Sequence, residues 1–162
     1  SSNLGSIASF TATGKENYKK DLARIAMCYP HVYVACVNIG YDKEHYLKVL
    51  KEAEAHNGPS LIIAYSSCIE HGIKVGMEHN IENAYLASEC GYFLTFNYNP
   101  DTGKFNLNSK NVNFDKYDEF LSGENRYANL KKVNNKEAKN LLNSQKEWAM
   151  KRYEYYKKLE EE

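Results

Sequence analysis

The sequence lacks the long features that identify membrane-spanning and secreted proteins. It has no run of about 18 apolar residues and no charged-then-apolar leader. Lys and Arg together number 21, as do Asp and Glu, so the formal net charge is zero. A balanced charge gives no electrostatic reason to bind nucleic acid or an anionic membrane. The composition therefore predicts a cytoplasmic protein with neither partner, and other partners must be inferred from sites.

The sequence also contains none of the short motifs that mark nucleotide-binding loops or hydrolase active sites. GxGxxG, a Walker-type loop, GxSxG and HExxH are all missing. The four cysteines include no CxxC pair, which argues against a self-contained zinc ribbon and a thioredoxin-like centre. We expect Cys28 and Cys36 to be small, reduced side chains buried in the core.

What the chain does contain is enough sequence for one domain with an appendage. A chain of 162 residues can bury a core without disulfides or metal. Residues 1–6 are polar and have no initiator methionine, which is typical of the interior of a longer polypeptide, although tag removal or processing would look the same. A shift toward Asn, Lys and Asp places a boundary near Asn108. This divides the chain into 1–108, an α/β unit, and 109–162, an extended and helical tail.

Two apolar runs separated by a helical pattern predict a βαβ unit. Residues 32–37 are β-branched and aromatic without strict alternation, as in a strand buried on both faces. Asp42 is placed to cap a helix over 43–56, whose expected inward residues are Tyr46, Leu47, Leu50 and Ala53. Residues 61–64 form the second strand. This order predicts an α/β fold with two parallel strands and a right-handed crossover, which needs further strands from upstream or from a partner.

Further elements flank this unit. Apolar residues at helical spacing predict a helix that starts near Lys20 and buries Leu22, Ile25, Ala26 and Tyr29. A short helix should follow Cys68 directly, and a second helix should cover 82–90. Residues 92–98 and 104–107 read as a hairpin joined by a turn-rich loop.

The tail carries two more helical stripes. The first is short, and the second is long and is preceded by Asn134 and Glu137 in a capping-box pattern. The buried residues expected from the two stripes are Tyr117, Phe120 and Leu121, and then Ala138, Leu141, Leu142, Gln145, Trp148, Ala149 and Tyr153. The last helix ends in a tyrosine-rich segment, so it should pack either on its own domain or on the surface of a partner.

The candidate site lies in residues 58–72, where a turn, a short apolar strand and Cys68 follow one another. The carboxyl ends of strands are where ligands bind in open α/β sheets. If Ser66 and Ser67 cap a helix here, the N–H groups and dipole of its first turn favour a Cys68 thiolate. Such a thiolate would be a nucleophile or a ligand for a soft metal; the alternative is a structural thiol.

His71 stands three residues after Cys68, a spacing that supplies half of a zinc site, but no second half is evident. It is either an acid–base group or an ordinary surface histidine. The other histidines show no metal-binding spacing and are expected on the surface: His31, His45, His56 and His79.

The ordered motifs of the chain resemble the C-terminal part of pyruvate:ferredoxin (flavodoxin) oxidoreductases over roughly residues 4 to 142. The residues that carry the resemblance are Lys20-Asp21-Leu22, Val32-Tyr33-Val34-Ala35, the segment from Leu47 to Glu54, Gly58-Pro59-Ser60-Leu61-Ile62-Ile63-Ala64-Tyr65, Cys68-Ile69-x-His71-Gly72-Ile73-x-x-Gly76-Met77, Glu89-Cys90-Gly91-Tyr92, Phe105-x-Leu107-x-Ser109-Lys110, and Phe120-Leu121-x-Gly123-Glu124-x-Arg126-Tyr127-Ala128-x-Leu130.

The resemblance implies a partial parallel sheet of the thiamine-diphosphate-binding type, with flanking helices and a helical C-terminal tail. It implies that Cys68 is one ligand of a [4Fe–4S] cluster whose other three ligands lie upstream, as do the residues for thiamine diphosphate and Mg²⁺. Ser66-Ser67 and Ser2-Asn3 depart from the family pattern, which leaves the local loop geometry open. No cofactor is expected on this chain alone.

The resemblance also implies a reaction for the parent enzyme, the oxidative decarboxylation of pyruvate with coenzyme A and with ferredoxin or flavodoxin as electron acceptor. The implied partners are the rest of the polypeptide and, in the parent, a second copy of it. The chain alone should be inactive. The alternative is a free-standing α/β interaction module without catalysis, whose aromatic C-terminal helix engages a protein.

Overall fold

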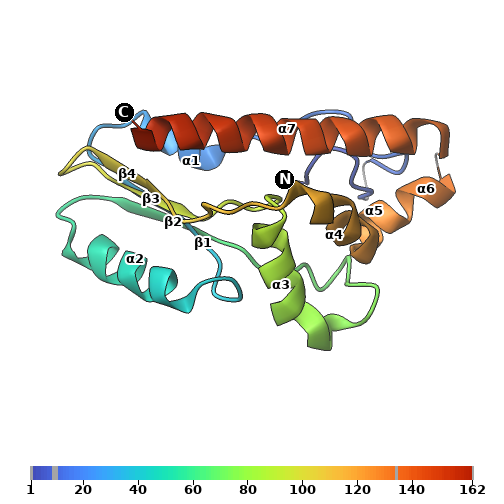
Figure 1. Ribbon diagram of the computed structural model, residues 1–162, viewed down its shortest axis with the longest axis horizontal. Coiled ribbons are helices and arrows are strands. Elements are labelled where there is room, and N and C mark those ends of the chain that lie inside the picture. Colours follow the sequence, from blue (N-terminus) through green and yellow to red (C-terminus); the bar gives the residue numbers. More distant parts are fainter. Residues whose placement is uncertain (1, 9–10, 134, 162) are drawn as a thin grey trace.

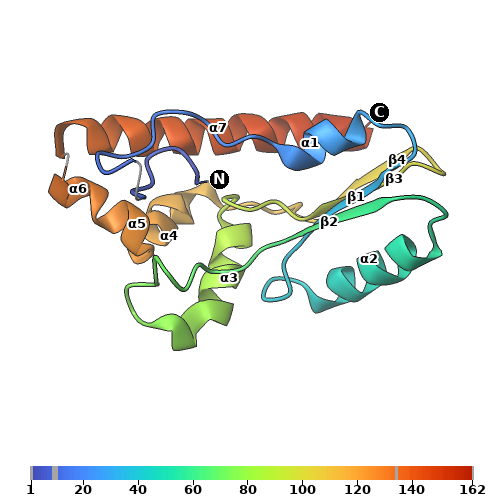
Figure 2. The ribbon, with the colours of Figure 1, turned by 180° about the vertical axis from the view of Figure 1, so that it is seen from behind.

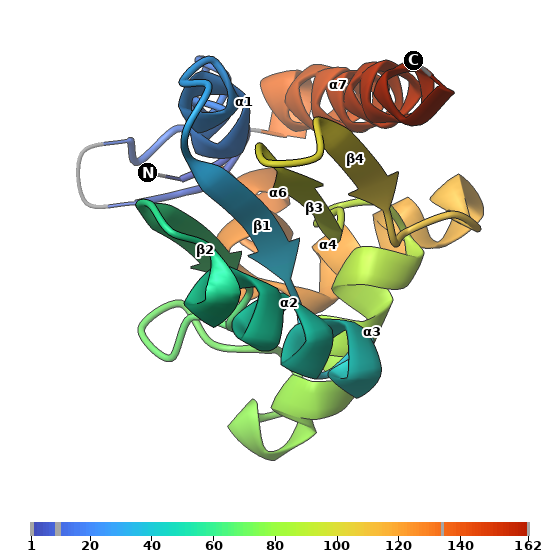
Figure 3. The same cartoon turned by 90° about the vertical axis from the view of Figure 1, so that its left-hand side faces the viewer.

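A computed structural model describes residues 2–8, 11–133 and 135–161. Its sheet contains four strands, β1 (Tyr33–Val37), β2 (Ser60–Ala64), β3 (Phe96–Asn99) and β4 (Lys104–Leu107), in the order β2-β1-β3-β4. β1 and β2 are parallel, with Ala35 opposite Ile62. β3 is antiparallel to both β1 and β4. The α/β class is confirmed, and the sheet is mixed because the hairpin of β3 and β4 pairs with β1 (Figure 3). The sequence predicts this hairpin over 92–98 and 104–107, and its first strand starts later, at Phe96.

Helices cover both faces of the sheet (Figure 1). Helix α2 (Lys43–Ala55) lies on one face, and α1 (Leu22–Met27) and α7 (Asn135–Glu161) lie on the other. The Asp42 carboxylate accepts the His45 amide at 2.9 Å, so the expected cap of α2 is confirmed. Every residue of β1 is buried, as its unbroken apolar pattern predicts.

The apolar stripes of α1 and α2 face the core only in part. Ala26 is buried as expected, and Tyr46 and Ala53 are partly buried against the cluster on the α2 side of the sheet. In α1 the buried residues are Ala23 and Ala26, whereas Leu22 is 54% and Ile25 50% exposed. The other side chains from these stripes that are exposed against expectation are Tyr29, Leu47 and Leu50. Small side chains let α1 approach the sheet closely, and α2 buries Val49 and His45 instead.

A second core lies beside the sheet. It is built by α3 (Asn80–Glu89), α4 (Tyr117–Gly123), α5 (Asn125–Ala128), α6 (Leu130–Val133) and the first half of α7, with single 3₁₀ turns η1 (Met77–His79) and η2 (Phe114–Lys116) before α3 and α4. The short tail stripe is buried as expected, since Tyr117, Phe120 and Leu121 all lie in this core.

Helix α7 runs past the sheet and past α4, α5 and α6 (Figure 2). It contributes Ala138, Leu142 and Ala149 to the second core. Its Tyr156 belongs to the apolar cluster between the sheet and the helices α1 and α7. The aromatic helix therefore packs on its own chain, which is one of the two expected outcomes. Its expected cap at Asn134 lies outside the described residues. The boundary near Asn108 stays a prediction.

The environments of Cys28 and His45 differ from those expected. Cys28 follows the last turn of α1 and is exposed, with its thiol donating to the Arg24 carbonyl oxygen at 3.4 Å. His45 is buried in the first turn of α2, and that burial lowers its pKa. Cys36 is buried as predicted. Within the described ranges, no helix is long and apolar enough to cross a bilayer.

Candidate functional site

The segment that follows β2 is a loop and not the short helix predicted after Cys68. The backbone from Tyr65 to Gly76 runs through turns, and α3 starts only at Asn80. The Gly72 amide donates to the Cys68 carbonyl oxygen at 2.8 Å, which closes a turn directly after the cysteine. Gly72 has φ +71° and Gly76 has φ +113°, conformations that end regular structure. The prediction that a helix dipole favours the Cys68 thiolate is therefore wrong, because residues 65–76 contain no helix.

The corner between α4 and α5 holds this loop in place. The Lys74 amide donates to the Gly123 carbonyl oxygen at 2.8 Å, and the Asn125 amide donates to the Gly72 carbonyl oxygen at 3.3 Å. Between these bonds, Ile73 and Glu124 form an antiparallel bridge. The loop after Cys68 thus depends on residues about fifty positions later in the chain for its shape.

A buried carboxylate connects the loop to two helices. Glu124 is only 2% exposed, and its Oε1 accepts the Asn83 amide group of α3 at 2.7 Å. Its Oε2 lies 3.1 Å from Nε of Arg126. The same Asn83 nitrogen donates to the Ser67 hydroxyl at 3.2 Å, next to Cys68. A carboxylate this deeply buried needs such partners, since an unpaired charge would cost several kcal/mol.

Cys68 and His71 meet at the start of the loop. The imidazole Nδ1 of His71 lies 3.0 Å from the Cys68 Sγ, and both side chains are partly buried. Ile69 between them is 82% exposed, so this part of the loop projects outward. The structure thus places His71 against the thiol and not in the first turn of a helix. Neither an acid–base role nor a ligand role follows from the contact alone.

The other three thiols are not brought to this site. Cys36 lies in the sheet and Cys90 in the second core, and burial raises the pKa of each to about 12. Cys28 lies on the surface at the end of α1. Within residues 2–8, 11–133 and 135–161, no group of three or more His, Cys, Asp or Glu side chains could hold a metal ion. The loop can offer one thiolate ligand to a centre whose remaining ligands come from elsewhere.

Sequence reasoning assigned no role to Glu124, Asn83 or Arg126. Glu124 and Arg126 stand two positions apart beside residues that are fully buried, Tyr127 and Leu130. Opposite charges so close together, between the apolar residues Leu121 and Tyr127, are a signal of a buried ion pair. The partner Asn83 could not be found from the sequence, because it lies 41 positions away on another helix.

Comparison with known proteins adds a second kind of finding. No protein-family model matches the chain. It is 42% identical over 161 residues to a pyruvate-flavodoxin oxidoreductase of Klebsiella pneumoniae, covering 96% of this chain and 14% of that protein. The pyruvate-flavodoxin oxidoreductase of Enterobacter agglomerans is 43% identical over 150 residues, which cover 90% of this chain and 13% of that protein. The pyruvate:ferredoxin oxidoreductase of Moorella thermoacetica is 41% identical over 161 residues, which cover 97% and 14%.

Proposed function

We propose a function from the premise that this chain is homologous to one region of the pyruvate:ferredoxin (flavodoxin) oxidoreductases, as its resemblance to them predicts. The chain corresponds to only 13–14% of the length of these relatives. In our proposal it is the C-terminal part of the thiamine-diphosphate-binding domain of such an enzyme. The observation that carries the proposal is an identity of about 40% that extends over 90–97% of the chain in three relatives.

The parent enzyme would oxidatively decarboxylate pyruvate to acetyl-CoA and CO₂ and pass the electrons through [4Fe–4S] clusters to ferredoxin or flavodoxin. Thiamine diphosphate with Mg²⁺ supplies the carbanion chemistry of such a reaction, and iron–sulfur clusters supply the one-electron steps. The residues that bind the diphosphate and Mg²⁺ would lie in the rest of the polypeptide. We propose that the chain by itself is therefore inactive.

Within this chain, Cys68 is the residue we assign to the metal. A [4Fe–4S] cluster is held by four thiolates, and this loop presents a single accessible thiol. The chemistry of the donor fits a cluster ligand, provided that three further cysteines converge on it from the remaining polypeptide. His71 lies within hydrogen-bonding distance of the sulfur, and such contacts orient a ligand and tune a metal centre.

Glu124 would act on the Cys68 site indirectly, through other residues. Through Asn83 and Ser67 it connects the residue before Cys68 to α3, and through the backbone bridge to Ile73 it holds the far side of the loop. A ligand loop fixed on both sides keeps the sulfur in one place while the iron is bound. We therefore assign Glu124 as a positioning residue and not as a ligand.

The remaining partners follow from the same proposal. They are the rest of the polypeptide, pyruvate, coenzyme A, ferredoxin or flavodoxin, and a second copy of the parent, in the cytoplasm. The alternative of a free-standing interaction module rested on the aromatic C-terminal helix. Tyr156 of that helix is buried against Phe96 and Phe105, so these rings support the fold of the chain itself.

The test is made in the complete polypeptide that contains this segment. Pyruvate- and CoA-dependent reduction of a viologen dye is measured for the parent enzyme, for Cys68→Ala and for the control Cys28→Ala. We expect Cys68→Ala to lose nearly all dye reduction and Cys28→Ala to retain it, because Cys28 lies on the surface beyond α1. Dye reduction that is absent from the parent, or unchanged in Cys68→Ala, would contradict the proposal.

A further inference from the structure

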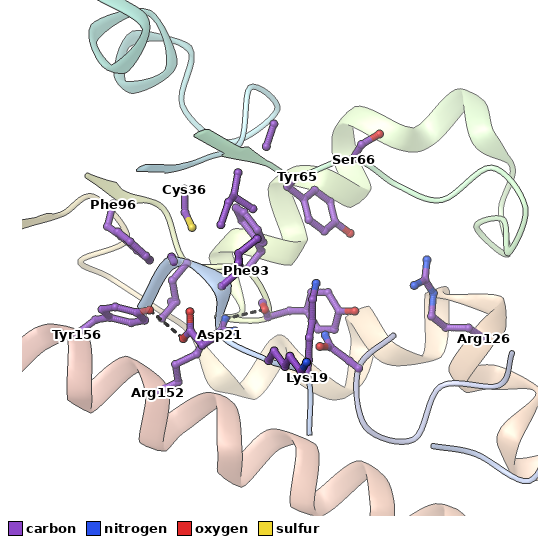
Figure 4. A pocket seen from close by; sticks show the side chains of 18 residues that line it. Lys19, Asp21, Cys36, Tyr65, Ser66, Phe93, Phe96, Arg126, Arg152 and Tyr156 are labelled. Atoms are coloured by element: carbon purple, nitrogen blue, oxygen red, sulfur yellow. Dashed lines mark hydrogen bonds between the residues drawn. The ribbon is translucent and has the colours of Figure 1, made fainter. Parts of the chain in front are cut away.

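A cavity of about 390 Å³ lies on the α7 side of the sheet, apart from the Cys68 thiol. It is lined by the segment that enters α1, the end of β2, the segment before β3, Arg126 of α5, and α7. Figure 4 shows Tyr65 and Ser66 on one side of it and Asp21, Arg152 and Tyr156 on the other. This volume lies within the range of small-molecule sites, about 300–1,000 Å³.

Positive charge predominates in this cavity although the whole chain is neutral. Four cationic side chains line it, Lys19, Lys20, Arg126 and Arg152, against one acidic side chain, Asp21. The Asp21 carboxylate is already bonded, since its Oδ2 accepts the Tyr156 hydroxyl at 2.8 Å and its Oδ1 accepts the Arg24 amide. Acidic and basic residues are equal in number over the whole chain, so the excess of positive charge is local to this cavity.

Only one of the four cations is neutralised. Arg126 forms its ion pair with Glu124, whereas in the described part of the chain Lys19 and Arg152 form no ion pair. Arg152 donates from Nη2 to the Tyr92 carbonyl oxygen at 3.1 Å, and its buried Nε has no hydrogen-bond partner among the described residues. Burial and the neighbouring Arg152 charge lower the pKa of Lys19.

Arg152 is partly buried and its charge acts on Lys19, and two neighbouring cations are unfavourable unless an anion lies between or beside them. A guanidinium has five donors in a plane and suits the oxygen atoms of phosphate and carboxylate groups. Tyr65 and Phe93, whose ring centroids lie 5.2 Å apart, form an aromatic wall of the cavity, and Phe96 lines it beside Tyr156. A cavity lined by both cations and rings matches a ligand with an anionic group and an apolar or planar part.

We propose that this cavity is a binding site for a small organic anion, with its phosphate or carboxylate group against Lys19 and Arg152 and its apolar part against the aromatic wall. The site requires no iron and no thiolate, so it is independent of the function proposed for Cys68. A failure of either proposal leaves the other intact.

The test uses inorganic phosphate and acetate as probes on the purified 162-residue chain, with sodium chloride at equal ionic strength as the reference. The ¹H–¹⁵N signal of the Arg152 Nε–H group is followed during titration, and the unfolding temperature is measured in parallel. We expect a saturable shift of that signal and a rise in unfolding temperature with at least one probe. Tighter binding of phosphate identifies a phosphate-bearing ligand, and tighter binding of acetate identifies a carboxylate.

Two variants remove one cation each, and a third is the matched control. Lys19 is an exposed residue, so Lys19→Gln should fold normally, and Arg152→Gln removes the guanidinium. Each variant should bind the preferred probe about tenfold more weakly, the effect of roughly one lost charge-assisted hydrogen bond. Lys104→Gln, at the exposed start of β4, should bind the probes as tightly as the unsubstituted 162-residue chain does. No saturable shift beyond that of chloride, or equal affinities in Lys19→Gln and Lys104→Gln, would overturn the proposal.

Discussion

The Nδ1 atom of His71 lies 3.0 Å from the Sγ atom of Cys68, across a turn that Gly72 closes. Cys68 is partly accessible and follows the end of β2, and the His71 imidazole lies beside its thiol. The loop holds this arrangement through hydrogen bonds to the α4–α5 corner and not through helix formation. Its shape and its chemistry can be tested separately.

The four thiols should react in an order set by their burial. We expect alkylation of the native chain by iodoacetamide to modify Cys28 first and to spare Cys36 and Cys90, because burial raises the pKa of the latter two to about 12 and blocks access. Mass spectrometry of tryptic peptides measures the order. All four should react alike in concentrated guanidinium chloride, and rapid native modification of Cys36 would show that the sheet core differs from the one described.

Glu124→Gln should destabilise the fold and loosen the Cys68 loop together. The substitution keeps an acceptor for Asn83 but removes the charge that pairs with Arg126, which for a buried pair costs about 3 kcal/mol. Urea unfolding measures the loss, and hydrogen exchange should be faster at the Gly72 and Lys74 amides. Glu119→Gln on the exposed face of α4 is the control and should change stability by less than about 0.5 kcal/mol. Equal free energies of unfolding for the two variants would contradict the assignment of Glu124 as a positioning residue.

Phe120→Ala tests the second core. The Phe120 ring is fully buried with its centroid 4.5 Å from that of Tyr92, so its loss should lower the free energy of unfolding by about 3–5 kcal/mol. Leu22→Ala, which truncates a mostly exposed side chain of α1, should cost far less. The two values come from the same denaturant series. A larger loss for Leu22→Ala would mean that α1 packs through its apolar stripe after all.

The pKa of His45 should be lower than that of His56. Burial lowers the pKa of His45 below its usual value of about 6.5, whereas the hydrogen bond that the His56 ring donates to the Asp101 carboxylate raises the pKa of His56. A depressed histidine pKa in the folded state means that unfolding takes up a proton, so the contribution of His45 to stability falls as the pH drops from about 6.5 toward its folded pKa. Titration of the imidazole C2 protons by NMR gives the order directly. The reverse order would place His45 on the surface.

Much of the sheet could be predicted from the sequence because its signals are local. The β-branched run of β1, the Asp42 cap and the turn before Lys104 each act within a few residues. The apolar stripes of α1 and α2 predicted the buried residues only in part. Periodicity shows which residues share one side of a helix, but it does not show which side meets the sheet. In α1 the small residues Ala23 and Ala26 are buried against the sheet, where they permit a close approach, and the larger Leu22 and Ile25 are exposed.

The candidate site was predictable in part. Its cysteine could be located from the order of turn, strand and thiol and from the resemblance, but its loop could not. Two serines before Cys68 suggest a helix cap, yet Gly72 and Gly76 adopt left-handed conformations and their neighbours bond to the backbone near Glu124. Those partners are distant in the sequence, so no local pattern encodes them.

The assignment of Cys68 as a cluster ligand is tested most directly by the iron content of the complete polypeptide. Iron per protein and the electron paramagnetic resonance spectrum after reduction are measured for the parent, for Cys68→Ala and for Cys28→Ala. The account predicts that Cys68→Ala loses the iron and the signal of one cluster, while Cys28→Ala keeps both. Full iron content and an unchanged spectrum in Cys68→Ala would contradict it.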